Sequence, residues 1–395
     1  MKTLSTRATG LAASPTLSLN ARLAARRHAG EEVLNLSVGE PDFAMPESAA
    51  LWARKAIDDG RSRYTEVAGV LELRERIVRK LAEDNGLRYG PDDIVVSAGA
   101  KHALYNAFFV LCGSGDEVVI PSPYWVTYPE QVRAAGAVPV FAATDERSGF
   151  KLTAARREAA VTERTKAVVL NSPGNPTGAT YTRAELAELA EVVLRHDLYV
   201  VEDLIYEHFH YGPGPVPSIA ALGDELRERT VVVNGISKSC AMTGWRIGYT
   251  AAPSPLARWI KRFQGQVTSN ASVVAQYAAI GAMDDVPWRD IASYRDRRDF
   301  GHRALTGIPE VRCVLPDGAF YLFPDVSGLL GRTHEGVPLR TSDEFCARLL
   351  DVTGVGLVPG TGFGADDHLR LSYAVSPDVL AEALSRLSEF AAALR

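Results

Sequence analysis

The chain is poor in cysteine and lysine, lacks long apolar runs, and carries no excess of positive charge. Its four cysteines, at positions 112, 240, 313 and 346, form no C-x-x-C pair, a pattern typical of reduced thiols in a cytosolic protein. No apolar stretch reaches the ~18 residues of a membrane helix. The formal net charge of -5 argues against a nucleic-acid partner. We therefore expect a cytoplasmic protein that acts on small molecules, away from membranes and nucleic acid.

The first 30 residues contain no Asp or Glu and several Arg. This is the composition of an organellar transit peptide, although the apolar core of a secretory signal is absent. The interpretation we favour is an ordered N-terminal arm that runs into the fold, with the transit peptide as the alternative.

Short β-branched runs alternate with amphipathic stretches between about residues 90 and 250. This alternation predicts an α/β fold, whose large domain has a mostly parallel sheet covered by helices. Ligands of such sheets bind at the carboxyl ends of the strands. The predicted strands are 93–97, 116–120, 137–142, 166–171, 198–203, 230–235 and 246–251.

The pattern changes from about residue 285. A charged helix (289–305) precedes two strands joined by an Asp-Gly turn (312–323), and a helix (341–351), short strands (near 354–358 and 368–373) and a final helix (377–394) follow. We predict a large domain over 46–285. A smaller α+β domain would combine residues 1–45, which include the N-terminal arm, with residues 286–395.

Nucleotide-binding signatures are missing: the first strand is not followed by G-x-G-x-x-G, and there is no Walker A lysine motif. Instead "AGAKHALYNAFF" opens a helix whose free N–H groups and dipole suit a phosphate. Further along, "SPGNPTG" (172–178) contains two X-Pro steps, which keep the backbone out of the helical region and hold Asn175 in a fixed direction. "HFH" (208–210) is interpreted as an edge segment, so we expect no bound metal.

Charged side chains follow two of the predicted strands. Asp203 ends one apolar strand, where a buried carboxylate needs a cationic partner. Lys238 follows the strand 230–235, with Arg246 close behind. A lysine beside a buried strand end tends to have a lowered pKa and to form Schiff bases with aldehydes.

These residues fit pyridoxal 5'-phosphate, a phosphorylated pyridine aldehyde. Lys238 would hold the aldehyde as an imine, and Asp203 would keep the ring nitrogen protonated. Tyr206 and Asn175 would hydrogen-bond the ring oxygen, and Trp125 would lie flat against the ring. The phosphate would be held by Arg246 and by the helix opening at Gly99, Ala100 and Lys101. Lys101 is a candidate for either the cofactor or an acidic substrate tail.

The chain resembles the class I aminotransferases of fold type I, and within them the bacterial aspartate aminotransferase subgroup. The resemblance is carried by "NLSVGEPDF" (35–43), "RYTEVAGVLELRE" (63–75), "SPYWVTYPE" (122–130), "NSPGNPTG" (171–178), "DLIYEHF" (203–209), "AMTGWRIGY" (241–249), "GAFY" (318–321) and "HLRLSYA" (368–374).

The resemblance implies further roles for individual residues. Arg370 would grip the substrate α-carboxylate, and Gly39 would close over the substrate, which Trp125 and Asn175 also contact. Tyr64 would reach the cofactor phosphate of a partner subunit, which implies a homodimer with shared active sites. Many relatives carry a phosphate-binding serine three residues before the lysine; here that position is Gly235, and Ser237 is the only nearby hydroxyl.

The implied activity is transfer of an amino group from an L-amino acid to a 2-oxo acid by a ping-pong mechanism. Aspartate or glutamate and 2-oxoglutarate are the default substrates. The departures close to the lysine, such as Ser239-Cys240 after it, keep one alternative open. That alternative is a repurposed relative that catalyses elimination, replacement or carbon–carbon bond formation on an amino acid.

Overall fold

A seven-stranded sheet forms the centre of the structure, a computed structural model that describes residues 2–395. The strand order is β2-β8-β7-β6-β5-β3-β4; β8 is antiparallel to both of its neighbours and the other pairs are parallel. This confirms the predicted α/β class. The strands are β2 (Ile94–Ser97), β3 (Glu117–Ser122), β4 (Val138–Ala143), β5 (Thr165–Asn171), β6 (Tyr199–Asp203), β7 (Thr230–Gly235) and β8 (Gly248–Ala251).

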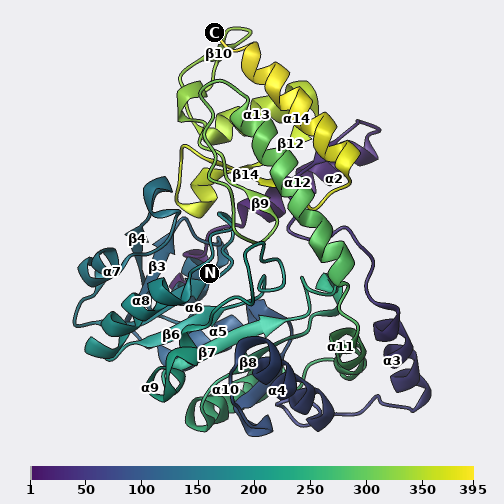
Figure 1. Cartoon of the computed structure of the whole chain (residues 1–395), viewed down its shortest axis with the longest axis vertical. Helices are drawn as coiled ribbons and strands as arrows, with labels where there is room; N and C mark the ends of the chain where they lie inside the picture. The colour runs from purple at the N-terminus through teal and green to yellow at the C-terminus, as the bar shows by residue number, and fades with distance from the viewer. Residues whose placement is uncertain (1) are drawn as a thin grey trace.

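Helices surround this sheet, as Figure 1 shows in the lower part of the view. Because both faces are covered, every residue of β7 is buried and the inner strands are continuous apolar runs. The helix α8 shows how the local sequence sets the start of a helix, because Thr182 and Glu185 form a reciprocal capping box there. The helices are α3 (Glu47–Asp58), α4 (Leu71–Asn85), α5 (Ala100–Leu111), α6 (Thr127–Ala134), α7 (Ala154–Ala160), α8 (Arg183–Arg195), α9 (Asp224–Arg227), α10 (Ser254–Val267) and α11 (Val273–Asp284).

A second unit lies at the other end of the molecule, reached by the long helix α12 (Trp288–Thr306) (Figure 1). Its sheet has the antiparallel order β13-β14-β9. The remaining elements are β9 (Tyr321–Leu322), β10 (Thr333–His334), β11 (Val337–Pro338), α13 (Ser342–Thr353), β12 (Val355–Gly356), β13 (Val358–Pro359), β14 (Leu369–Ser372) and α14 (Pro377–Ala392). The short 3-10 helices of the described residues are η1 (Pro91–Asp93), η2 (Glu146–Ser148), η3 (Ile219–Leu222), η4 (Thr243–Trp245), η5 (Ser327–Leu329) and η6 (Gly360–Phe363).

The N-terminal segment packs against this second unit. After α1 (Thr6–Thr9) and α2 (Pro15–His28), the strand β1 (Leu34–Asn35) pairs in parallel with β12. Leu34 and Leu36 belong to the same apolar core as the C-terminal helices. The domain boundaries after residues 45 and 285 stay a prediction.

One predicted element, the hairpin at 312–323, is wrong. Arg312 makes only an isolated bridge with Asp325, and β9 is two residues long. The Asp-Gly turn instead contacts the large sheet unit, because the Gly318 N–H donates to the Gly178 carbonyl at 2.9 Å and the Ala319 N–H donates to the Phe209 carbonyl at 2.8 Å. A Cβ at Gly318 would lie 2.5 Å from Pro173, so glycine is needed for this close approach rather than for a hairpin.

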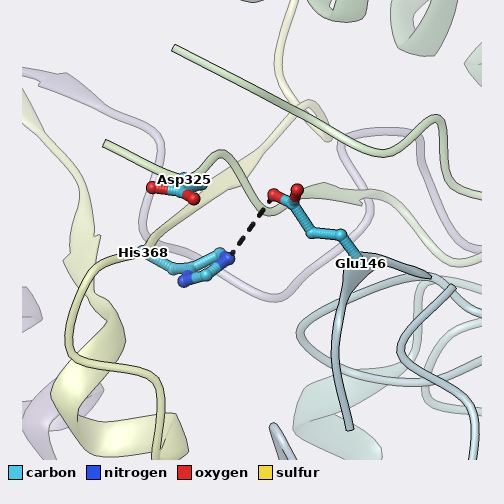
Figure 2. A group of neighbouring side chains, drawn as sticks. All are labelled: Glu146, Asp325 and His368. Carbon is cyan, nitrogen blue, oxygen red and sulfur yellow. Dashed lines mark ion pairs between the residues drawn. The ribbon is translucent and has the colours of Figure 1, made fainter. Parts of the chain in front are cut away.

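Glu146, Asp325 and His368 face one another where η2 meets the second unit (Figure 2). The His368 Nε2 atom lies 3.9 Å from a Glu146 oxygen. Arg312 forms ion pairs with both carboxylates, its Nε atom lying 3.4 Å from Glu146. Because this guanidinium already supplies the positive charge, we interpret the cluster as an ion-pair network that links the two units.

No helix among residues 2–395 is long and apolar enough to cross a membrane. All four cysteines are unbonded thiols.

Candidate active site

A cavity of about 400 Å³ lies at the carboxyl ends of β5, β6 and β7, where it also meets β9, β14 and α2. It brings together most of the residues singled out from the sequence. These are Gly39, Ala100, Lys101, Trp125, Asn175, Asp203, Tyr206, Ser237, Lys238, Arg246 and Arg370. The cavity is therefore built from segments that lie far apart in the chain and belong to both units.

Lys238 enters the cavity just beyond the end of β7, and its side chain is partly buried. Its Nζ atom donates a 2.6 Å hydrogen bond to the Gly39 carbonyl and lies 5.9 Å from the centre of the Tyr206 ring. Burial lowers the pKa of this amine to about 8; the Glu40 and Asp203 charges oppose this shift, and the Arg246 and Arg370 charges add to it. A lysine held in this way loses its proton more readily than a free lysine, as a nucleophile or proton acceptor requires.

Asp203 is the last residue of β6 and is almost completely buried. It accepts a 2.7 Å hydrogen bond from the Tyr128 hydroxyl and a 3.1 Å hydrogen bond from the Ile205 N–H. Burial nevertheless raises its pKa to about 6, because these donors offset the desolvation only in part. A cationic ring nitrogen would supply the missing counter-charge.

Tyr206 and Asn175 point into the same cavity from the segments after β6 and β5. The Tyr206 hydroxyl lies 2.8 Å from that of Tyr321. Asn175 is positioned through its own backbone, whose N–H donates a 2.9 Å hydrogen bond to the Asn171 side chain. The two side chains are thus fixed by neighbouring residues before any ligand is present.

One end of the cavity is suited to an anion. The helix α5 starts at Ala100, and the first N–H groups of a helix have no partner within it. Gly99 precedes it with φ of 88°, and a Cβ there would come within 2.3 Å of the Arg246 guanidinium. Arg246 is exposed and makes no ion pair among the described residues, and Ser237 is buried nearby. A phosphate group matches this arrangement of donors and positive charge.

Lys101 and Trp125 lie next to this end. The Lys101 Nζ atom is 5.0 Å from the centre of the Trp125 ring. Burial lowers the pKa of Lys101, and the Arg246 charge lowers it further. Two cations held this close favour a ligand that carries more than one negative charge.

Arg370 lies on β14, lines the same cavity and is 2% exposed. It donates to the Asn175 side chain at 3.0 Å and to the Ser37 carbonyl at 2.7 Å, and its guanidinium lies over the Tyr321 ring. Its Nε atom has no hydrogen-bond partner, and among residues 2–395 no carboxylate lies within ion-pair distance of it. A buried guanidinium without a carboxylate is an expensive arrangement unless a ligand supplies one.

Gly39 lines the cavity, whereas Tyr64 lies outside it. A Cβ at Gly39 would lie 2.5 Å from the Tyr321 hydroxyl, so only glycine brings this backbone against the cavity. Tyr64 is 90% exposed and does not line the cavity. Its role toward a partner subunit stays a prediction.

Sequence reasoning missed two tyrosines. Tyr128 holds Asp203, and Tyr321 contacts Tyr206 and Arg370. Both lie inside the motifs that carried the resemblance, "SPYWVTYPE" and "GAFY". The available signal was that a buried tyrosine hydroxyl needs a polar partner. The four α2-region residues Ser14, Thr16, Leu17 and Asn20 also line the cavity, with no signal in the sequence.

Comparisons with known proteins extend over the whole site. A family model described as "Aminotransferase class I and II" matches residues 31–387. The aspartate aminotransferase of Geobacillus stearothermophilus is 45% identical over 391 residues, covering 98% of each chain. The aspartate/prephenate aminotransferase of Cereibacter sphaeroides is 44% identical, covering 96% of each chain. The crystal structure of the aspartate aminotransferase from Rhizobium meliloti matches with a TM-score of 0.95 and 40% identity, covering 100% of both chains.

Proposed function

The chain belongs to the class I and II aminotransferase family, whose enzymes depend on pyridoxal 5'-phosphate, and we propose that its amino donor is aspartate or glutamate and its acceptor 2-oxoglutarate. One observation carries the proposal: Lys238, Asp203 and Arg370 meet in one cavity, and none of the three forms an ion pair with another residue in 2–395. The relatives named above supply the substrate class.

The cavity residues fit the cofactor. The helix start at Ala100, with Arg246 and Ser237, would hold the phosphate, and Asp203 would face the ring nitrogen. The raised pKa of Asp203 supports this fit, since a cation there would stabilise the ionised carboxylate. When bound, pyridoxal phosphate supplies an aldehyde for Lys238 and a ring that accepts electron density from the substrate α-carbon.

Lys238 would move the proton. As a neutral amine, Lys238 would take the substrate α-proton, and as an ammonium it would give a proton back. The lowered pKa of about 8 favours this exchange at neutral pH. Asp203 assists by keeping the ring nitrogen protonated.

Arg370 and Lys101 would hold the two carboxylates of the substrate. The two-pronged guanidinium of Arg370 suits the α-carboxylate, which would accept a hydrogen bond from its unpartnered Nε atom. Lys101, which lines the same cavity, would bind the distal carboxylate of aspartate. The alternative of elimination or carbon–carbon bond formation gains no support, because each relative named above is an aminotransferase.

The protein would act in the cytoplasm as a homodimer. Four unbonded thiols suit a reducing compartment. Tyr64 is free to reach a second subunit because it is 90% exposed in the single chain. Light scattering tests the homodimer by measuring the mass in solution. The shared site is tested by Tyr64→Phe, which should lower the affinity for the cofactor.

The test of the activity is a single half-reaction. The yellow, cofactor-loaded protein is mixed with one amino acid and no 2-oxo acid, and the spectrum and products are followed. We expect aspartate to convert the cofactor to its amine form with release of oxaloacetate. Return of the spectrum to its starting form without any 2-oxo acid would overturn the proposal. Prephenate and 2-oxoglutarate are then compared as acceptors in the second half-reaction.

Substitution of Lys101 separates its two candidate roles. If Lys101 binds the distal carboxylate, Lys101→Met should raise KM for aspartate by about tenfold, because one charge-assisted hydrogen bond is lost. KM for an amino acid with an uncharged side chain should not change. A drop in phosphate-dependent cofactor affinity, with unaltered substrate preference, would assign Lys101 to the cofactor instead.

A further inference from the structure

A second cavity, of about 250 Å³, lies behind the catalytic lysine. Its lining includes Gly235, Ile236, Ser239 and Cys240, while Ser237 and Lys238 line the first cavity. The segment 235–240 is therefore the wall between the two cavities.

The second cavity is organised around the buried carboxylate of Glu207. Lys80 on α4 forms an ion pair with it, and the Asn85 side chain donates to it at 2.6 Å. The Asn234 side chain donates to the same oxygen as Lys80. Lys80, Glu207 and Asn234 are 7%, 9% and 3% exposed, so this network is largely buried in the cavity wall.

The network joins the two segments that carry the catalytic groups. Glu207 directly follows Tyr206, and Asn234 lies four residues before Lys238. The Asn234 side-chain oxygen accepts a 2.7 Å hydrogen bond from the Gly235 N–H, which fixes the start of the lysine segment. Glu207 is therefore bonded to the lysine segment through Asn234 and is joined in the chain to Tyr206.

A buried ion pair rarely adds stability compared with apolar residues of the same shape, but it fixes geometry because its hydrogen bonds are directional. Proton transfer requires such precision, since misplacement of a reacting group by about 1 Å can cost about 10²-fold in rate. We propose that Glu207, held by Lys80 and acting through Asn234, is a positioning residue that sets Lys238 relative to the substrate α-carbon. This inference rests on the proposed role of Lys238.

The experiment compares Glu207→Gln with Glu117→Gln in the cofactor-loaded enzyme. Glu117 is also a buried glutamate, bonded to Thr162 and Arg164, but it lies at the amino end of β3, away from the site. The rate is measured with ordinary aspartate and with aspartate deuterated at the α-carbon, alongside thermal unfolding.

We expect Glu207→Gln to lower kcat about tenfold or more and to increase the deuterium isotope effect, because proton transfer becomes slower than the other steps. KM for aspartate should stay within about threefold, since Arg370 is untouched. Glu117→Gln should change stability but not the isotope effect. If Glu207→Gln folds poorly, Asn234→Ser is measured in its place. Asn234→Ser removes only the link to Gly235 and Glu207, and it should give the same lower kcat and larger isotope effect.

An unchanged kcat and isotope effect in folded Glu207→Gln and Asn234→Ser would overturn the inference. The proposed function fails differently: it requires Lys238→Ala to be inactive, whatever the behaviour of Glu207. An isotope effect raised equally by Glu117→Gln would show a general loss of rigidity and would also overturn the positioning role.

Discussion

The two sides of the segment 235–240 treat buried charge in opposite ways. On one side, Lys238, Asp203 and Arg370 make no ion pair with any residue in 2–395. On the other side, Lys80 and Glu207 are paired directly and share further hydrogen bonds with asparagines. Charge that the protein does not compensate marks the place of a charged ligand, whereas compensated charge holds structure.

The pKa values follow the same division. On the ligand side, burial raises the pKa of Asp203 to about 6 and lowers that of Lys238 to about 8, so both charged forms are disfavoured. On the other side, burial also acts to raise the pKa of Glu207. The Lys80 charge and the surrounding donors nevertheless hold it below its usual value.

The largest loss of activity is expected when Lys238 is removed from the ligand side of the segment 235–240. Lys238→Ala should lower transamination by at least ~10³-fold, because both the cofactor bond and the proton carrier are lost. Circular dichroism should show a normal fold, and noncovalent cofactor binding should persist through the phosphate site. Normal turnover by this variant would rule the scheme out.

The next largest effect is expected for Asp203→Asn. The amide keeps the shape and the Tyr128 contact but cannot stabilise a protonated ring nitrogen. Turnover should fall by about 10²–10³-fold, a loss typical of one preorganised electrostatic partner. The half-reaction rate is the measurement, and a variant within twofold of the parent would show that Asp203 does not face the ring nitrogen.

Arg370→Lys tests the carboxylate side of the cavity. A lysine keeps the charge but loses the two-pronged geometry, so KM for aspartate should rise about 10- to 100-fold. The matched control is Arg386→Lys, a surface arginine paired with Glu382 and Glu32, for which KM should not change. Equal effects in both variants would contradict the role of Arg370.

The smallest effect is expected for Glu202→Gln, which changes how the unfolding free energy depends on pH. Glu202 precedes Asp203 and is buried with Ser218 and Ile219 as donors but no cation, and burial raises its pKa to about 7. The folded state therefore binds its proton more tightly than the unfolded state. Stability from this group is present below pH 4.5 and is lost as the pH rises through 7.

The substitution should flatten the pH dependence of the unfolding free energy over this range, by at most about 1.4 kcal/mol per pH unit because one proton is involved. Denaturant unfolding at several pH values measures it, and turnover should stay unchanged. An unaltered slope would show that Glu202 remains ionised in the folded protein.

The central sheet was predictable because its strands are continuous apolar runs that end in turn residues, as in β5 and β7. The hairpin at 312–323 was not, because its Asp-Gly turn is used for contact with Gly178 and Phe209, which are distant in the chain. Local turn chemistry indicates a bend but does not specify what the bend contacts.

Some residues of the candidate site could be predicted from the sequence and others could not. Asp203 and Lys238 were recognisable because each places a charge at the end of a buried strand. Arg370 came only from the family resemblance, since nothing local distinguishes it from other arginines. Tyr128 was missed because its contact with Asp203 exists only in the folded chain, where α6 packs against β3 and β4. The roles of all these residues stay predictions until the variants are measured.

The sheet order also constrains when the enzyme becomes competent during its synthesis. Within the sheet, β2 pairs only with β8, in register from Ile94 with Ala251 to Ser97 with Gly248. Arg246, which lies against Gly99, reaches its place only with that pairing. A nascent chain thus cannot assemble the proposed phosphate site until the ribosome has made β8, and the proposed carboxylate site is incomplete until Arg370 has emerged.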